Sequence, residues 1–384
     1  MYARTPFLVQ VNEAGQTGSK VELFISLTST FPATPTYTLE KNNPSSTNNL
    51  TRYNVSPFVR EFISNTYQNI RTLPSPATLT PSGASAYIQI KRYKNVSGTY
   101  TLLDTRTYRS FDGYRAYVEG SGAFVTLPFA PWNNEALTFN SAFPLFQYPS
   151  GMVFYYPQTS SASVPSGLLS PGYLTAFIGI SAYVKYISLA NTANTQTTNI
   201  DAVNQRYCDI PYIWQSATTP SSNYYAGGNI VEFYSPTNVL LQSFTFKPLA
   251  ECRYTPVTID FINKLGGWQR VFFFKASIDK ITTTSEDYNF LTAVPVVNQW
   301  TVSDGQTRQM NRNARRKITV NSGSVDENFK FIIEQLMLSE RIMVNNLPAK
   351  ILTNDADLFK IVNKKDLNYT LDFEFAYDEV ATVY

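Results

Sequence analysis

Residues 367–377 read LNYTLDFEFAY, the most regular alternation of apolar and polar side chains in the sequence. Every odd-numbered position is apolar, whereas the even-numbered positions as far as Glu374 are polar. Because successive side chains of a strand point to opposite faces, this pattern predicts a β-strand with one wholly apolar face. Such a face must be covered by a helix or by a second sheet.

The segment upstream of this strand predicts the covering helix. Ser324 and Glu327 have the spacing of a capping box, in which the two side chains bond the exposed N–H groups at the helix start. Apolar residues then recur at helical spacing and predict an amphipathic helix ending near Ser339: Val325, Phe329, Ile332, Ile333 and Leu336. We therefore expect residues 306–384 to form a small C-terminal α+β module with a basic lead-in.

The rest of the chain reads mainly as strands separated by turns. Residues 21–28 and 87–93 alternate with period two, and a turn at residues 95–98 predicts a hairpin. Pro57 opens a short stretch that predicts one helical turn. Further strands are predicted at 175–186, 230–234, 239–246, 256–261 and 269–274.

These patterns predict a mainly β fold built of tandem β-sandwich-like modules. We expect modules at residues 1–130 and 171–305, joined by a Pro/Ser-rich connection at 131–170. A short match supports duplication of one module: Arg52-Tyr53 followed by Pro57 recurs at the same spacing as Arg206-Tyr207 followed by Pro211. In a Tyr-rich sequence the match is also explained by chance.

Composition indicates a surface made for contact with other macromolecules. Among 384 residues, 43% are hydrophobic and only 15% are charged, so uncharged polar groups and tyrosine must cover the surface. The net charge of +3 is too balanced to indicate nucleic acid as the main partner.

The sequence contains no histidine, which excludes several classes of active site. Histidine-based triads, histidine zinc sites and the facial iron triad all require it. Neighbouring carboxylates such as Glu286 and Asp287 have no pairing geometry that the sequence reveals, so we expect neither catalysis nor a cofactor. Cys208 and Cys252 are too few for a structural zinc site, and the sequence leaves open whether they are bonded.

No targeting or membrane segment is predicted. Residues 1–20 lack the basic and apolar regions of a signal peptide, and no apolar run approaches the ~18 residues needed to span a bilayer. We expect a protein that is made in the cytoplasm and is not exported by a classical route.

Two clusters are candidate binding sites. The first is a basic run without acidic residues, read as a phosphate contact, a solvated arm or an interface with an acidic neighbour: Arg308, Arg312, Arg315, Arg316 and Lys317. The second is a set of aromatic residues, read as a glycan-stacking surface or as core: Tyr155, Tyr156, Trp214, Tyr224, Tyr225 and Trp268.

Four stretches in order along the chain resemble structural virion proteins of tailed phages, particularly phages that infect Bacteroidota. The stretches are VSPFVREFI at 55–63, NKLGGWQ at 263–269, LSE at 338–340 and YTLDFEF at 369–375. The resemblance implies a non-enzymatic part of a tail, tail tip or baseplate that contacts other copies of itself and other virion proteins. The alternatives are a receptor- or glycan-binding protein on the virion and a head-surface decoration protein.

Overall fold

The computed structural model describes most of the chain, and strands dominate it, which confirms the mainly β fold class. The described residues are 1–45, 47–66, 85–114, 148–158, 173–177, 183–199, 207–213, 227–235, 237–251, 253–289, 305, 307–358 and 367–380. The helical elements described are α1 (Ser56–Thr66), α3 (Lys330–Met337) and the 3-10 turn η4 (Glu327–Phe329). Neither of these two α-helices has the length and apolar character to cross a membrane.

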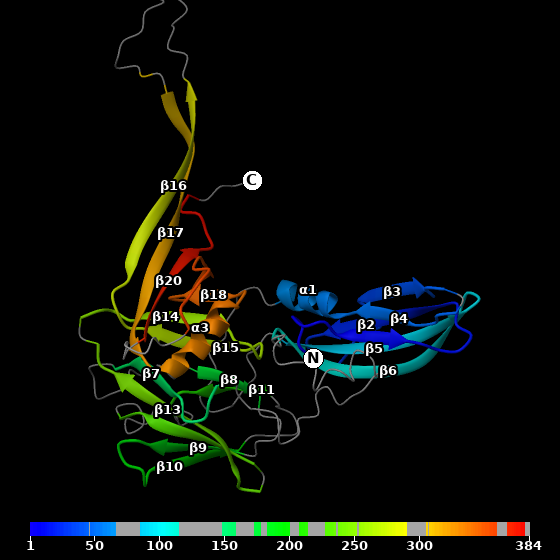
Figure 1. Cartoon of the computed structure of the whole chain (residues 1–384), viewed down its shortest axis with the longest axis horizontal. Coiled ribbons are helices and arrows are strands. Elements are labelled where there is room, and N and C mark those ends of the chain that lie inside the picture. The colour runs from blue at the N-terminus through cyan, green and yellow to red at the C-terminus, as the bar shows by residue number, and fades with distance from the viewer. Residues whose placement is uncertain are drawn as a thin grey trace, which may run out of the picture. The chain divides into compact units, whose positions relative to one another are not determined.

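The N-terminal residues form a four-stranded antiparallel sheet (Figure 1). Its strands, in spatial order, are β3 (Tyr37–Asn42), β2 (Gly18–Ser26), β5 (Ser85–Val96) and β6 (Thr99–Phe111). Alternating residues of β2 are buried, and the predicted hairpin turns at Ser97 and Gly98, both of which have positive φ.

A second layer covers this sheet. Strands β1 (Leu8–Val11) and β4 (Thr51–Asn54) pair antiparallel, and α1 follows directly. The predicted helical turn is in fact an 11-residue helix. Val59 and Ile63 lie one turn apart on α1 and are buried in the same core as β1, β2 and β5, so burial of this face stabilises the longer helix.

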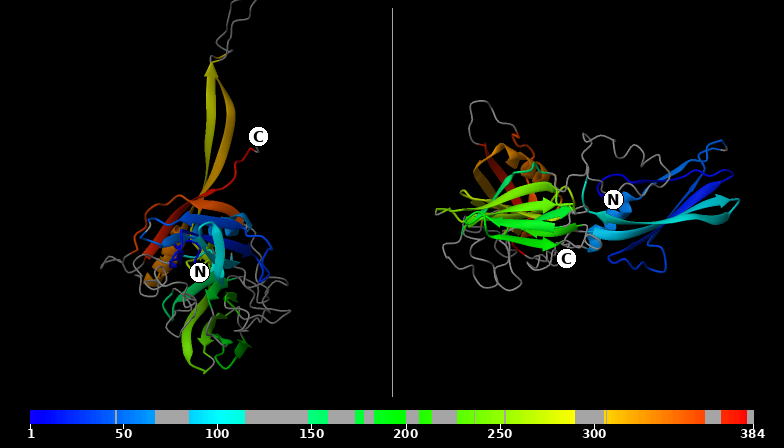
Figure 2. Two further views of the ribbon diagram at one scale, coloured as in Figure 1. Left: turned by 90° about the vertical axis from the view of Figure 1, so that its right-hand side faces the viewer. Right: turned by 90° about the horizontal axis from the view of Figure 1, so that it is seen from below.

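A five-stranded sheet follows in the middle of the chain (Figure 2). Its spatial order is β10 (Thr195–Asn199), β9 (Tyr183–Ser188), β12 (Asn229–Tyr234), β13 (Leu240–Leu249) and β7 (Val153–Pro157). Its core is aromatic: the Phe246 ring lies 5.2 Å from Phe154 and 4.4 Å from Tyr212, centroid to centroid.

The remaining strands form a nine-stranded sheet. Its spatial order is β11 (Tyr207–Pro211), β8 (Tyr173–Phe177), β15 (Trp268–Phe273), β14 (Val257–Ile262), β18 (Ile342–Val344), β19 (Leu347–Ile351), β20 (Leu367–Phe375), β17 (Thr307–Val325) and β16 (Ile278–Asn289). Strand β20 covers most of the alternating segment, and its odd-numbered residues from Leu367 to Phe375 are all buried, as predicted. Tyr377, predicted on the same face, lies beyond the strand and is 39% exposed.

The helix upstream of β20 is confirmed, although its cap differs from the prediction. Ile332, Ile333 and Leu336 are buried on α3. Ser324 belongs to β17, and Asp326 is the cap of η4, with its carboxylate accepting a hydrogen bond from the Asn328 N–H. The Asp326 carboxylate reaches the Asn328 N–H two residues away by itself, so the predicted pairing of Ser324 with Glu327 is not needed to cap this turn.

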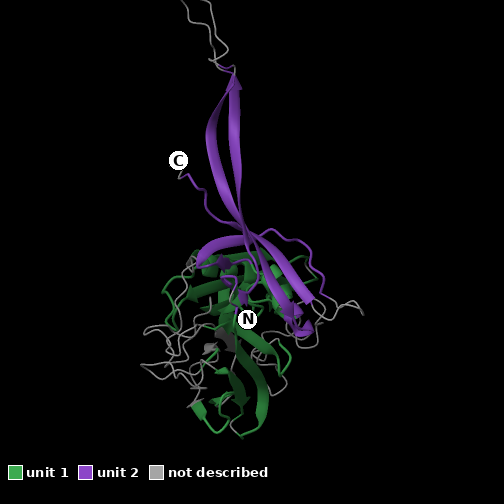
Figure 3. Cartoon of the chain, turned by 90° about the vertical axis from the view of Figure 1, so that its left-hand side faces the viewer, with its two compact units in different colours: residues 1–250, 260–271, 331–339 green, residues 251–259, 272–330, 340–384 purple. Residues whose placement is uncertain are grey.

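The chain divides into two compact units (Figure 3). Unit 1 comprises residues 1–250, 260–271 and 331–339, and unit 2 comprises residues 251–259, 272–330 and 340–384. The nine-stranded sheet takes strands from both sides of residue 305, whereas the tandem β-sandwich arrangement stays a prediction. The two copies of the proposed repeat differ in structure, because Pro57 lies in α1 and Pro211 ends β11.

Candidate functional site

Strands β16 and β17 form a long antiparallel ribbon in unit 2 (Figures 1 and 3). Their pairing runs from Ile278 opposite Thr319 to Asn289 opposite Thr307. Every residue of β16 is exposed, as are residues 307–312 of β17. We call residues 278–284 and 313–319 the ribbon base, and residues 285–289 and 307–312 the distal ribbon.

The predicted basic run lies along β17, and the structure divides it into two groups. Arg315, Arg316 and Lys317 lie in the ribbon base and pair with carboxylates of the same chain. Arg308 and Arg312 lie in the exposed distal ribbon. Three of the five cations therefore pair with carboxylates of the chain itself. The other two lie on the exposed distal ribbon, where Arg312 also donates a hydrogen bond to the Gln309 side chain.

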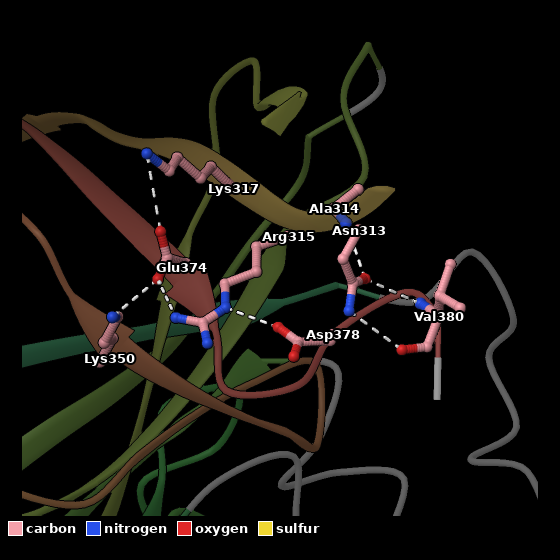
Figure 4. Close-up of polar contacts among 8 residues, drawn as sticks. All are labelled: Asn313, Ala314, Arg315, Lys317, Lys350, Glu374, Asp378 and Val380. Atoms are coloured by element: carbon pink, nitrogen blue, oxygen red, sulfur yellow. Dashed lines mark hydrogen bonds and ion pairs between the residues drawn. The ribbon is translucent and has the colours of Figure 1, made fainter. Parts of the chain in front are cut away.

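Glu374 of β20 is the centre of the contacts in the ribbon base (Figure 4). Its carboxylate lies 2.7 Å from the Lys350 Nζ, 3.5 Å from the Arg315 guanidinium and 3.6 Å from the Lys317 Nζ. The hydrogen bond from Lys350 is the main cause that lowers the pKa of Glu374 below its ordinary value, and the charges of the three cations add to it, against the opposing effect of burial. The cluster joins β17, β19 and β20.

The segment that follows β20 continues along β17 and bonds the same edge of β17 that β20 pairs with. The Glu379 N–H donates to the Ala314 carbonyl at 2.8 Å. The Asn313 side chain donates to the Val380 carbonyl at 3.2 Å and accepts from the Val380 N–H at 3.1 Å (Figure 4). Its amide thus bonds both backbone groups of Val380, in the way that a residue of a paired strand would. Asp378 binds Arg315 at 2.7 Å and Glu379 binds Arg316 at 2.6 Å, so side-chain charges reinforce the backbone contact.

We expect acidification to weaken the ribbon base through Glu374. Because its folded pKa is lowered, the stabilisation is fully present above the ordinary pKa of 4.5 and is lost as the pH falls through the folded value. Glu374→Gln should cost about 1 kcal/mol near neutral pH, since the three cations are partly exposed and screened. Urea unfolding of both proteins should show this difference at pH 7 and its disappearance in acid. A difference that is unchanged by acid would contradict this role of Glu374.

The distal ribbon exposes apolar side chains and has no core of its own. Tyr288 is 40% exposed and Met310 is 45% exposed, and they lie on one face of the ribbon. The pairing register shifts between Thr284 and Glu286, where Asn311 adopts a positive φ of 51°. Asparagine tolerates this conformation better than most residues, so the irregularity is built into the sequence.

The predicted glycan-stacking surface is not brought together by the described residues. Tyr156 lies in β7 and Trp268 begins β15, and both are buried, so the glycan-stacking alternative is wrong for these two residues and the core alternative is right. Strand β7 is the last strand of its sheet and β15 lies inside the nine-stranded sheet, and in both places the large aromatic ring fills the core. Tyr155 is half-buried, whereas Trp214, Tyr224 and Tyr225 lie outside the described residues.

Sequence reasoning missed two parts of the site. It did not predict β16, and it did not recognise Asp378 and Glu379 as partners of the basic run. The signal for β16 was weak: β-branched residues are frequent, but Ile278 and Ile281 lie three residues apart and the three threonines are consecutive, so no period-two pattern appears. The signal for the acidic partners was the concentration of carboxylates just after the strongest strand.

Other candidate chemistry is limited in the part of the chain that the structure describes. Its residues contain no group of three or more cysteine, aspartate and glutamate side chains placed to hold a metal ion. The side chains of Cys208 and Cys252 lie outside the described residues, so their pairing stays open. Comparison of the chain with protein-family models, curated proteins and solved structures found no match.

Proposed function

We propose that this chain is a non-enzymatic structural component of a tailed-phage virion, most specifically of the tail, tail tip or baseplate. Its distal ribbon contacts neighbouring subunits. The observation that carries the proposal is the ribbon itself, a long regular element that contributes almost nothing to the core of its own chain.

Physical reasoning favours a partner for such a ribbon. An isolated two-stranded hairpin is marginal in water, because it buries too little apolar surface to offset the entropy lost on ordering. Here Glu374 and residues 378–380 bind only the ribbon base, so these contacts do not stabilise the distal ribbon directly. Docking of Tyr288 and Met310 on a neighbour would bury the apolar surface that the free chain exposes.

The low-charge composition and the resemblance to virion proteins support the same proposal. A surface with 15% charged residues suits permanent contact with other subunits. The alternative of glycan binding has less support, because two of its six candidate rings are buried. A head-surface decoration protein would use the ribbon in the same way, with a different set of neighbours.

Mass spectrometry of purified particles tests the proposal directly. We expect the chain to be present in a fixed ratio to the other virion proteins across independent preparations and after removal of loosely bound protein by a density gradient. Its absence from the particles, or a ratio that varies with each wash, would end this interpretation.

A further inference from the structure

The distal ribbon has two backbone edges that no described strand covers. Strand β16 is the last strand of its sheet, so its outer edge has no neighbour among the described strands. On the other edge, β20 pairs with β17 only from Lys317 inward, and the segment after β20 reaches only Ala314 and Asn313. Residues 307–312 therefore present a second open edge. Open N–H and C=O groups of this kind favour pairing with another strand.

The two edges carry opposite charges. In the distal part of β16 the charged residues are Glu286 and Asp287, and both are acidic. In residues 307–312 of β17 they are Arg308 and Arg312, and both are basic. All four are exposed. Glu286 accepts a hydrogen bond from the Asn311 side-chain amide, and Arg312 donates one to the Gln309 side chain, and neither of these partners is charged.

The pairing register places these charges at matching heights along the ribbon. Glu286 lies opposite Met310, and Asp287 lies opposite Gln309. The two carboxylates are therefore level with the interval between Arg308 and Arg312. If two ribbons stand side by side at equal height, the acidic pair of one is flanked by the two arginines of the other.

We propose that the distal ribbons of neighbouring copies pair edge to edge, with β16 of one copy against β17 of the next. This arrangement continues the antiparallel ladder and brings opposite charges together across the contact. Pairing of β16 with β16, or of β17 with β17, would place like charges side by side and is disfavoured. A contact between two different edges is heterologous, and its repetition closes into a ring when the rotation between copies allows. The inference rests on the proposed function, because it specifies the surface that joins the copies.

Charge reversal tests the edge assignment in the full chain. The acidic-edge variant is Glu286→Lys/Asp287→Lys, and the basic-edge variant is Arg308→Glu/Arg312→Glu. Each makes both edges of the ribbon alike in charge and should weaken self-association about tenfold in sedimentation velocity at low salt. The chain that carries all four substitutions regains opposite edges and should associate as the wild type does.

The four-substitution chain is the decisive comparison. Association that stays weak in this chain overturns the proposal, because restored complementarity should rescue pairing between different edges but not between like edges. A wild-type chain that is monomeric at its highest soluble concentration also overturns it. Association of the wild type should fall with added salt, since the four charges are exposed and screened. Thermal unfolding of all variants should match the wild type, which separates loss of pairing from loss of fold.

These results are distinguishable from failure of the proposed function. A chain that occurs in purified particles at a fixed ratio, but whose four-substitution variant does not associate, keeps its structural role and loses only the edge pairing. A chain that is absent from particles but pairs through these edges loses the virion assignment alone.

Discussion

Replacing residues 285–312 by Asn-Gly should leave the chain folded and abolish its association with neighbouring copies. Thr284 and Asn313 are directly opposite each other in the ribbon. The replacement joins them by a two-residue turn of the type that hairpins favour. The contact between Asn313 and Val380 is kept. Because the deleted described residues are exposed, the free energy of unfolding should change by less than about 1 kcal/mol.

Sedimentation velocity and incorporation into particles measure the effect of this truncation. We expect a monomer that fails to enter particles, with unchanged urea unfolding of the remaining chain. A truncated chain that associates and incorporates like the full chain would show that the ribbon is not the contact surface.

A matched pair of double substitutions separates the apolar contact from the loss of the whole ribbon. Tyr288→Ser/Met310→Ser removes exposed apolar groups from the distal ribbon, where the two residues are 40% and 45% exposed. Tyr100→Ser/Leu102→Ser removes a similar pair from the β5–β6 hairpin, where the exposures are 37% and 48%. Association should weaken only in the first variant. Equal effects in both would indicate non-specific attraction between apolar side chains.

The largest expected loss of stability comes from Asp260→Ala in unit 1. Asp260 of β14 accepts two hydrogen bonds from the guanidinium of Arg270 on β15, both at 2.8 Å, and its side chain is 0% exposed. Removal of the carboxylate leaves a nearly buried guanidinium without its counter-charge, which costs about 3–5 kcal/mol. Urea unfolding measures this loss.

A second Arg–Asp pair with the same geometry is the control. Arg92 of β5 donates twice to Asp104 of β6, at 2.8 and 2.6 Å, but the Asp104 side chain is 26% exposed. Arg92 also donates to the Gln10 carbonyl, so Asp104→Ala leaves part of its hydrogen bonding in place, and the partly exposed Asp104 position admits water. We expect a smaller loss, about 1–2 kcal/mol. Equal losses of stability in the two variants would contradict the idea that burial of the aspartate decides how large the loss is.

Much of the fold near β20 was predictable because burial leaves a pattern in the sequence. A strand with one buried face must alternate, as residues 367–375 do, and a half-buried helix must repeat every three to four residues, as α3 does. The turn at Ser97–Gly98 was visible for a different reason, since positive φ restricts which residues fit there. Features can be predicted from the sequence where packing or backbone conformation restricts which residues fit.

The ribbon was not predictable in this way because nothing in its own chain packs against it. Residues of β16 are exposed on both faces, so neither face is required to be apolar and no burial pattern appears. The sequence of the basic run is equally compatible with binding to phosphate, exposure to solvent and pairing with an acidic neighbour. Only the register, which places Lys317 beside Glu374, shows that part of it pairs within the chain.

The sequence left the aromatic set open between core and glycan-stacking surface, because residue type alone does not distinguish the two. Tyr156 lies in β7, which pairs with the distant β13, and Trp268 begins β15, one neighbour of which is the distant β8. Helix α1 was predicted too short for a similar reason, since β1, β2 and β5 provide the surface that buries Val59 and Ile63. Contacts between distant segments decide these features, and local patterns do not contain them.

Electron cryomicroscopy of the assembled particle, at a resolution that traces individual strands, shows whether the distal ribbon is a contact surface. We expect the distal ribbon of each copy to be buried against a neighbouring subunit, with Tyr288 and Met310 removed from solvent. A map in which the ribbons of all copies project freely into solvent would contradict it.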